Sequence, residues 1–258
     1  MLVSAVQMDV RTGDPEANFD RAYRLIREAA RRGSQAVLLP EMWNIGFPGS
    51  GLVDLAKATF RPTVRFMCEA AREAKAWILG SVGEPAGERV YNTLLWCSPR
   101  GEVAGSYRKV HLFTPTGEDR HFAAGDVAAP VETDFGLTGG LICFDVRFPE
   151  LARKLALEGA WILFVPAQFP HPRSAHWDVL LQARAIENQV WVVASNRIGK
   201  SGELEYFGRS AIIDPWGRVV DAAYEEREAV ISAEIRFEQV EAVRSALPCP
   251  RRPEVYSG

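Results

Sequence analysis

The same order of predicted elements occurs twice along this chain, once in each half. The segment GSQAVLLPE (33–41) is similar to GAWILFVPA (159–167), and AKAWILGSV (74–82) is similar to NQVWVVASN (188–196). In both halves, short apolar runs alternate with longer segments of helical periodicity. We therefore expect two similar α/β halves.

Hydrophobic periodicity predicts the individual elements of both halves. The apolar strands should be parallel and covered by helices on both faces, and hairpins should add antiparallel edges. Two such halves can pack sheet against sheet with their helices outside, which gives an α/β fold in the form of a four-layer αββα sandwich. No Gly/Ser- or Pro-rich linker separates the halves, so we expect one domain over residues 1–258. The predicted strands are 2–8, 35–41, 136–144 and 161–167, the helices 19–33 and 149–159, the helix-to-strand segments 64–82 and 179–196, and the hairpins 90–109 and 209–222.

Composition excludes several classes of partner. The net charge is −3, and no stripe of Lys and Arg is interleaved with aromatic residues, so a nucleic-acid partner is not expected. The amino-terminal segment lacks a signal-peptide pattern, and no apolar run approaches the roughly 18 residues of a membrane span. We expect a cytoplasmic protein that uses no cofactor.

The cysteines and histidines do not form a recognisable metal-binding or disulfide pattern. The four cysteines have wide, irregular separations, which indicates neither a zinc site nor a disulfide framework. The four histidines are also scattered and are expected to be structural. The cysteines are at positions 68, 97, 143 and 249, and the histidines at 111, 121, 171 and 176.

Three reactive side chains are predicted at strand ends, where α/β folds build their sites. They are Glu41, Lys109 and Cys143. In GGLICFDVRFPE (139–150), the thiol lies between an apolar strand and a helix start, as in a nucleophile elbow, where the helix dipole favours thiolate. No histidine lies nearby, so its base should be a carboxylate. Each residue also has a simpler interpretation: a buried core thiol, a helix-capping carboxylate and a solvated lysine.

Together, these segments resemble the three catalytic blocks of the nitrilase, or carbon-nitrogen hydrolase, superfamily. The blocks are LLPEMW, YRKVHLF followed by a glutamate nine residues after the lysine, and GLICFDVRFPE. The resemblance extends to HWDVLLQARAIENQVWVVASN and the tail RRPEVY, so it covers nearly the whole chain. Each block alone is a weak signal, but three in the same order are a strong one.

The resemblance implies an αββα sandwich, a Glu-Lys-Cys triad and a homodimer or larger assembly. By position, Glu41 is the general base for Cys143, and Lys109 stabilises the oxyanion together with the backbone N–H of Phe144. Glu118 is expected to position the substrate amide and the lysine. The reaction would proceed by thiolate attack, loss of ammonia and hydrolysis of a thioester.

The segment after the nucleophile favours the amidase branches of this superfamily. True nitrilases typically have Cys-Trp-Glu, whereas this chain has CFDVRFP and is most similar to omega-amidases, which hydrolyse 2-oxoglutaramate-type amides of α-keto acids. Phe144 departs from the tyrosine common there. Deaminated-glutathione amidases, N-carbamoyl amino acid amidohydrolases and nitrilases remain alternatives, as do a redox-sensing thiol protein and an inactive interaction module.

Such a substrate carries a carboxylate at the end distant from its amide, so its pocket needs a cation near the thiol. The planar guanidinium group suits bidentate carboxylate binding. One candidate, Arg147, could instead pair with Glu150 at a helix start. The predicted substrate-binding residues are the cations Arg147 and Arg173 and the apolar wall residues Phe113, Phe144 and Phe169.

Overall fold

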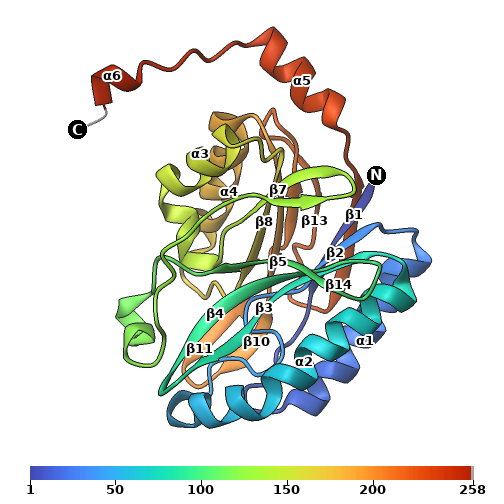
Figure 1. Cartoon of the computed structure of the whole chain (residues 1–258), viewed down its shortest axis with the longest axis vertical. Helices are drawn as coiled ribbons and strands as arrows, with labels where there is room; N and C mark the ends of the chain where they lie inside the picture. The colour runs from blue at the N-terminus through green and yellow to red at the C-terminus, as the bar shows by residue number, and fades with distance from the viewer. Residues whose placement is uncertain (257–258) are drawn as a thin grey trace.

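The computed structural model describes residues 1–256, and its strands form two six-stranded sheets packed face to face (Figure 1). The order in the first sheet is β14 (Ala229–Glu234), β1 (Leu2–Gln7), β2 (Ala36–Leu38), β3 (Trp77–Ala86), β4 (Arg89–Cys97) and β5 (Val103–Arg108). The order in the second is β13 (Val219–Ala222), β12 (Ala211–Ile213), β9 (Trp191–Asn196), β8 (Ile162–Ala167), β7 (Gly136–Gly140) and β6 (Val131–Thr133).

Both sheets have the same plan, as the internal repeat predicts. Strands β1, β2 and β3 are parallel in one sheet, and β7, β8 and β9 are parallel in the other. Antiparallel strands flank each parallel core. A separate hairpin of β10 (Ile198–Ser201) and β11 (Leu204–Phe207) follows β9.

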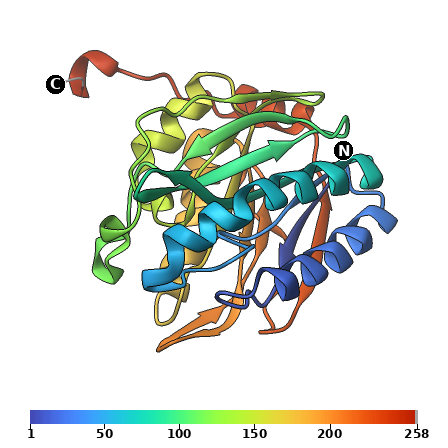
Figure 2. The same cartoon turned by 60° about the horizontal axis from the view of Figure 1, so that its bottom comes forward.

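Two helices cover the outer face of each sheet (Figures 1 and 2). Helices α1 (Pro15–Arg31) and α2 (Leu52–Ala74) lie on the first sheet, where Leu25 and Met67 join its apolar core. Helices α3 (Pro149–Leu157) and α4 (Ser174–Asn188) lie on the second. The predicted four-layer αββα sandwich is confirmed.

The two sheets approach closely where β4 of the first faces β7 of the second. A Cβ atom on Gly140 would lie 2.6 Å from the Trp96 ring and 2.8 Å from Leu94 of the opposite sheet, so this position leaves no room for a side chain. Polar groups also join the layers: the Trp96 indole N–H donates to Thr138 at 3.1 Å. This contact fixes the relative placement of strand ends from the two halves.

Most helices and strands occur where periodicity predicts them, but several boundaries differ. Helix α1 begins at Pro15 rather than residue 19, because Asp14 caps it by accepting from the backbone N–H of Ala17, and proline fits the first helical turn. Helix α2 begins at Leu52 and contains Pro62, whereas the predicted helix began at residue 64. A proline inside a helix removes one N–H donor, yet here the helix continues through it.

Some elements lack a strong sequence signal and were not predicted. They include β6, β14 and the β10–β11 hairpin, together with the carboxyl-terminal helices α5 (Phe237–Ala246) and α6 (Pro253–Tyr256). Helix α5 packs through Val240 and Val243, and α6 lies away from the sandwich (Figure 1). Within residues 1–256, no helix combines the length and apolar character that a membrane crossing needs.

Candidate active site

Glu41 lies in a turn three residues beyond β2, not at the end of the strand as predicted. The side chain is buried, with 1 % of its surface exposed, and its oxygens are held by donors from three other segments. Oε1 accepts from Lys109 Nζ at 2.9 Å and from Asn92 Nδ2 at 2.8 Å. Oε2 accepts from the backbone N–H of Gln168 at 2.8 Å. The carboxylate therefore has a fixed orientation.

Lys109 follows β5 directly, and its ammonium group joins two carboxylates. Its side chain is 2 % exposed, and Nζ lies 2.9 Å from Glu41 and 2.8 Å from Glu118. Its backbone N–H donates to Asn92 O at 2.9 Å, which continues the β4–β5 pairing by one step. The cation is thus aligned both by the sheet and by its two acidic partners.

Glu118 lies in the loop after β5, at the start of a short 3₁₀ turn, Glu118–Arg120. Gly117 precedes it with φ of +74°, a conformation that glycine adopts at little cost. Besides holding Lys109, the Glu118 carboxylate accepts from the backbone N–H of Phe113 at 2.5 Å. It therefore links the lysine to the loop that lines the cavity.

Cys143 occupies a strained turn, three residues beyond the end of β7. Its φ is +48°, and it begins the 3₁₀ turn Cys143–Arg147 that leads into α3. A left-handed conformation costs a non-glycine residue about 1–2 kcal/mol, so surrounding contacts must hold it. The predicted strand over 136–144 is wrong at its carboxyl end, because the backbone turns sharply to present this thiol.

Asp145 provides the contacts that hold the elbow. Its buried carboxylate accepts from Ile142 N at 2.9 Å and from the Tyr107 hydroxyl at 2.7 Å. Its other oxygen accepts from His111 N at 3.0 Å and lies 2.8 Å from Nδ1 of the same residue. This role of Asp145 was not predicted, although an acid two residues after the nucleophile is a usable sequence signal for a capped turn.

Burial and charge set the protonation of the site. Burial and then the charge of Glu41 raise the pKa of Cys143 well above its ordinary value. Burial also raises the pKa of Glu41, although Lys109 opposes the shift. For Lys109, burial alone would lower the pKa, but the attraction of Glu118 and Glu41 reverses this. The resting site therefore contains a neutral thiol beside a carboxylate whose proton affinity is increased.

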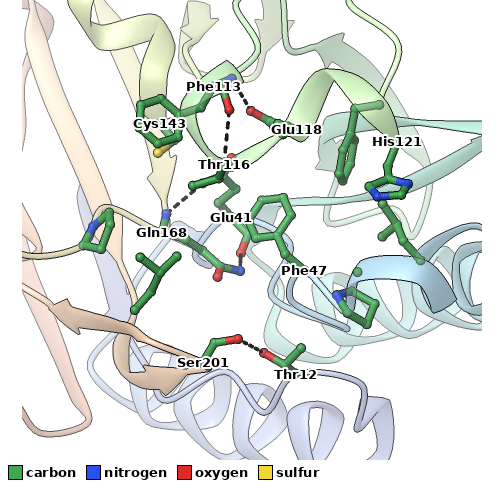
Figure 3. A pocket seen from close by; sticks show the side chains of 18 of the residues that line it. Thr12, Glu41, Phe47, Phe113, Thr116, Glu118, His121, Cys143, Gln168 and Ser201 are labelled. Atoms are coloured by element: carbon green, nitrogen blue, oxygen red, sulfur yellow. Dashed lines mark hydrogen bonds between the residues drawn. The ribbon is translucent and has the colours of Figure 1, made fainter.

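These side chains face one cavity of about 520 Å³ (Figure 3). Cys143, Glu41, Lys109 and Glu118 all contribute to its lining. In Figure 3, Cys143 and Gln168 lie on one side, and Phe47 and His121 on the other. Thr12 and Ser201 lie at the bottom of this view, and the apolar residues of the lining include Leu52, Phe122 and Leu204. The cavity is thus mainly apolar, and its charged groups gather near the thiol.

The predicted substrate-binding residues differ in whether they line the cavity. Phe113 lines the cavity. Phe144 packs against the Phe113 ring, and the two ring centres are 5.0 Å apart. Phe169 is buried against Trp177. Arg173 lies over the Phe113 ring, with 5.1 Å between its guanidinium carbon and the ring centre. Of the five predicted residues, Phe113 alone is among the described residues that line the cavity.

Arg147 lies close enough to Arg173 and to Cys143 for both to influence its charge. Burial and then the charge of Arg173 lower the pKa of Arg147, while Cys143 raises it. Among the residues that the structure describes, neither arginine has a carboxylate within ion-pair distance, so the alternative pairing of Arg147 with Glu150 is not observed. Two neighbouring cations without an acid form a favourable environment for an anion.

Further contacts of the site depend on pairing between the two sheets. Gln168 follows β8 and also donates from its side chain to the backbone carbonyl of Glu41 at 2.7 Å. The buried Arg197 donates in turn to Gln168 Oε1 at 3.1 Å. Sequence patterns did not point to Asn92, Gln168 or Arg197, because their contacts arise only when distant strand ends meet.

Comparison with known proteins gives a consistent family assignment. The family model described as "Carbon-nitrogen hydrolase" matches residues 2–245. The chain is 37 % identical over 247 residues to the 2-oxoglutaramate amidase of Bacillus subtilis (strain 168), covering 95 % of each protein. It is 40 % identical over 265 residues to the deaminated glutathione amidase of Synechocystis, covering 96 % of each.

Solved structures show the same fold. A carbon-nitrogen hydrolase superfamily protein from Xanthomonas campestris superposes with a TM-score of 0.89 at 33 % identity, over 96 % of this chain and 95 % of that protein. Its crystal structure contains an arsenic adduct in the active site. The αββα arrangement and the catalytic-block resemblance therefore lead to the same family.

Proposed function

The chain belongs to the carbon-nitrogen hydrolase family and is an amidohydrolase, and we propose that it is a cysteine-dependent omega-amidase. Its substrates would be amides of the 2-oxoglutaramate type, which it converts to the acid and ammonia. The observation that carries this proposal is the buried Glu41–Lys109–Glu118 network beside the strained elbow of Cys143. The similarity to a 2-oxoglutaramate amidase supports the choice of substrate.

The first half-reaction forms a thioester. Glu41 accepts the Cys143 proton as the sulfur attacks the amide carbonyl carbon, because the raised pKa of Glu41 makes it a better base than an ordinary carboxylate. The carbonyl oxygen becomes an oxyanion held by the Lys109 ammonium and the Phe144 N–H. Glu41 then returns the proton to the departing nitrogen, the C–N bond breaks, and ammonia leaves.

The second half-reaction releases the acid. Glu41 takes a proton from a water molecule while the water oxygen attacks the carbonyl carbon of the thioester. Collapse of the second tetrahedral intermediate breaks the C–S bond, and the sulfur of Cys143 recovers its proton from Glu41. Glu118 holds Lys109 in place throughout through its 2.8 Å contact with the ammonium group. No cofactor is required by this sequence of steps.

In this proposal, substrate specificity comes from Arg147 and Arg173, which have no acidic partner within residues 1–256. A keto-acid amide would bind along Phe113. Its amide group would lie at Cys143, and its carboxylate would lie near Arg147 and Arg173. Such a carboxylate would relieve the repulsion between the two guanidinium groups. A neutral amide would gain nothing from this arrangement.

Replacing either arginine should discriminate between acidic and neutral amides. We expect Arg173→Met or Arg147→Met to lower kcat/KM for 2-oxoglutaramate by roughly ten- to a hundredfold, since a charged hydrogen bond contributes about 1.5–3 kcal/mol. Steady-state kinetics on 2-oxoglutaramate and on a short neutral amide would measure this. Methionine preserves much of the packing on the neighbouring rings.

Two controls make this test specific. Arg218→Met removes an exposed cation outside the cavity lining and should leave the ratio of the two kcat/KM values unchanged. Arg173→Lys should retain part of the preference for the acidic amide. Equal losses on acidic and neutral amides, or a parent enzyme that prefers nitriles or N-carbamoyl amino acids, would contradict the proposal.

A second candidate substrate class is a longer keto-acid amide, such as deaminated glutathione. A cavity of about 520 Å³ is large for a five-carbon amide, and it extends from Cys143 to Thr12 and Ser201. The 40 % identity to a deaminated glutathione amidase points the same way. Comparing kcat/KM for 2-oxoglutaramate and deaminated glutathione decides between the two.

The proposal also includes a single catalytic domain over residues 1–258, a cytoplasmic location and assembly into a homodimer or larger oligomer. Free, scattered cysteines are typical of a reducing compartment. For assembly, helix α3 would form a self-complementary contact between protomers. We expect multi-angle light scattering at micromolar concentration to give at least twice the chain mass. A monomer mass would exclude this part of the proposal.

A further inference from the structure

Two cysteines outside the active site lie in direct contact. Cys68 on α2 and Cys97 at the end of β4 place their Sγ atoms 3.7 Å apart, although 29 positions separate them in the sequence. Cys97 is fully buried, whereas Cys68 is partly exposed. The pair therefore has one thiol that solvent can reach and one that it cannot.

We propose that Cys68 and Cys97 form an oxidisable dithiol, which a hydroperoxide converts into a disulfide that cross-links α2 to β4. The site is separate from Cys143, Glu41 and Lys109, so the proposal is independent of the amidase mechanism. Both thiols belong to the apolar layer between α2 and the first sheet.

The chemistry of the two thiols is complementary. The hydrogen bond with Cys97 lowers the pKa of Cys68 to about 7, against the opposing effect of burial. The same contact, followed by burial, raises the pKa of Cys97. Near neutral pH, Cys68 therefore ionises much more readily than Cys97, and the thiolate is the reactive form.

The reaction balances with hydrogen peroxide as the oxidant. The Cys68 thiolate attacks one peroxide oxygen, an S–O bond forms, the O–O bond breaks, and the released hydroxide takes up a proton to become water. Cys97 then loses its proton as its sulfur attacks the Cys68 sulfenic acid. The S–S bond forms, the S–O bond breaks, and a second water leaves. Two thiols are oxidised and one peroxide is reduced.

The segment that follows Cys97 lies against the backbone of α2 at Cys68. The turn between β4 and β5 packs against α2, since a Cβ atom on Gly101 would lie 3.4 Å from the Cys68 carbonyl oxygen. The sulfur atoms must close from 3.7 Å to about 2.05 Å, which side-chain rotation and a small backbone shift can supply.

The other cysteines should react differently. Cys143 is buried beside the Glu41 carboxylate, and both features raise its pKa, so little of it is thiolate at rest. Cys249 is exposed, and within residues 1–256 no other cysteine sulfur contacts it. A low concentration of hydrogen peroxide should therefore oxidise the Cys68–Cys97 pair while Cys143 stays reduced.

The test is to treat the full-length folded protein with one equivalent of hydrogen peroxide, block remaining thiols under denaturing conditions, and map peptides by mass spectrometry. We expect a linked peptide containing Cys68 and Cys97, lighter than the two free peptides by two hydrogens and lost on treatment with dithiothreitol. Cys143 should be recovered as the blocked thiol.

Matched variants complete the experiment. Cys68→Ser replaces the partly exposed thiol and should abolish the linked peptide. Cys97→Ala replaces the buried thiol and should abolish it as well. Cys249→Ala should form the link as the parent does. Oxidation of Cys68 to sulfinic acid with Cys97 still free, a link between other cysteines, or prior oxidation of Cys143 would each overturn the proposal.

Discussion

Replacing Cys143 with alanine should abolish amide hydrolysis while leaving the fold intact. The change removes only one sulfur atom from a nearly buried position and keeps the same Cβ atom in the elbow. Without that sulfur no thioester can form, and loss of the nucleophile in a catalytic triad lowers kcat by at least about 10⁴-fold. Ammonia release from 2-oxoglutaramate measures the effect.

Mass spectrometry provides a second readout of the same variant. Rapid quenching of the parent enzyme during turnover should trap an acyl adduct on the peptide that contains Cys143, and the alanine variant should show none. Cys249→Ala is the matched control and should keep most of the activity. Substantial hydrolysis by the Cys143→Ala protein would exclude covalent catalysis at this thiol.

The repeated pattern in the sequence was sufficient to predict the sandwich. Apolar runs of strand length alternate with helical segments in both halves, and this order leaves few ways to bury all the apolar faces. Short runs such as WILFVPA have no polar face, so they must lie between two layers. The observed β8, with every residue buried, shows why that signal was reliable.

The details of the site could not be obtained from periodicity, because they depend on sharp turns and long-range contacts. Glu41 and Cys143 each lie three residues past a strand that the sequence extends too far. A positive φ at Met42 and at Cys143 has no hydrophobic signature. Residue types and motif order located the four catalytic candidates, whereas Asn92 required the folded sheet.

The arginines illustrate a different limit. Sequence alone offered both Arg147 and Arg173 as carboxylate ligands, without a means of choosing between them. The structure places Arg147 over aromatic rings beside the site and Arg173 over the Phe113 ring, and neither arginine is among the described residues that line the cavity. Their distance from a bound carboxylate depends on how those rings are arranged around substrate, which no local pattern encodes.

The charges on Glu41 and Lys109 should be as necessary as the thiol itself. We expect Glu41→Gln to lower kcat by roughly 10²–10⁴-fold, because this is the usual contribution of a general base. Lys109→Ala should lower kcat by about 10²–10³-fold, since it removes an oxyanion donor worth about 3 kcal/mol. Circular dichroism must show native structure for either loss to count.

Lys109→Ala also leaves two buried carboxylates without their cation, which is expected to cost several kcal/mol of folding stability. The double variant Lys109→Met/Glu118→Gln removes one charge of each sign and should recover much of that stability, measured by urea unfolding, without recovering activity. A double variant that regained the parent kcat would show that Lys109 serves only to balance charge.

The pH dependence of kcat/KM gives the sharpest test of the base. Protonated Glu41 cannot accept the thiol proton, so activity should fall as pH decreases through the pKa of the site. Because burial raises that pKa above the ordinary 4.5, the midpoint of the acid limb should lie above pH 4.5. The residual activity of Glu41→Gln should lack this limb, since a glutamine does not titrate, while Cys249→Ala should retain it. An acid limb unchanged in Glu41→Gln would assign the titration to another group and remove Glu41 from the role of base.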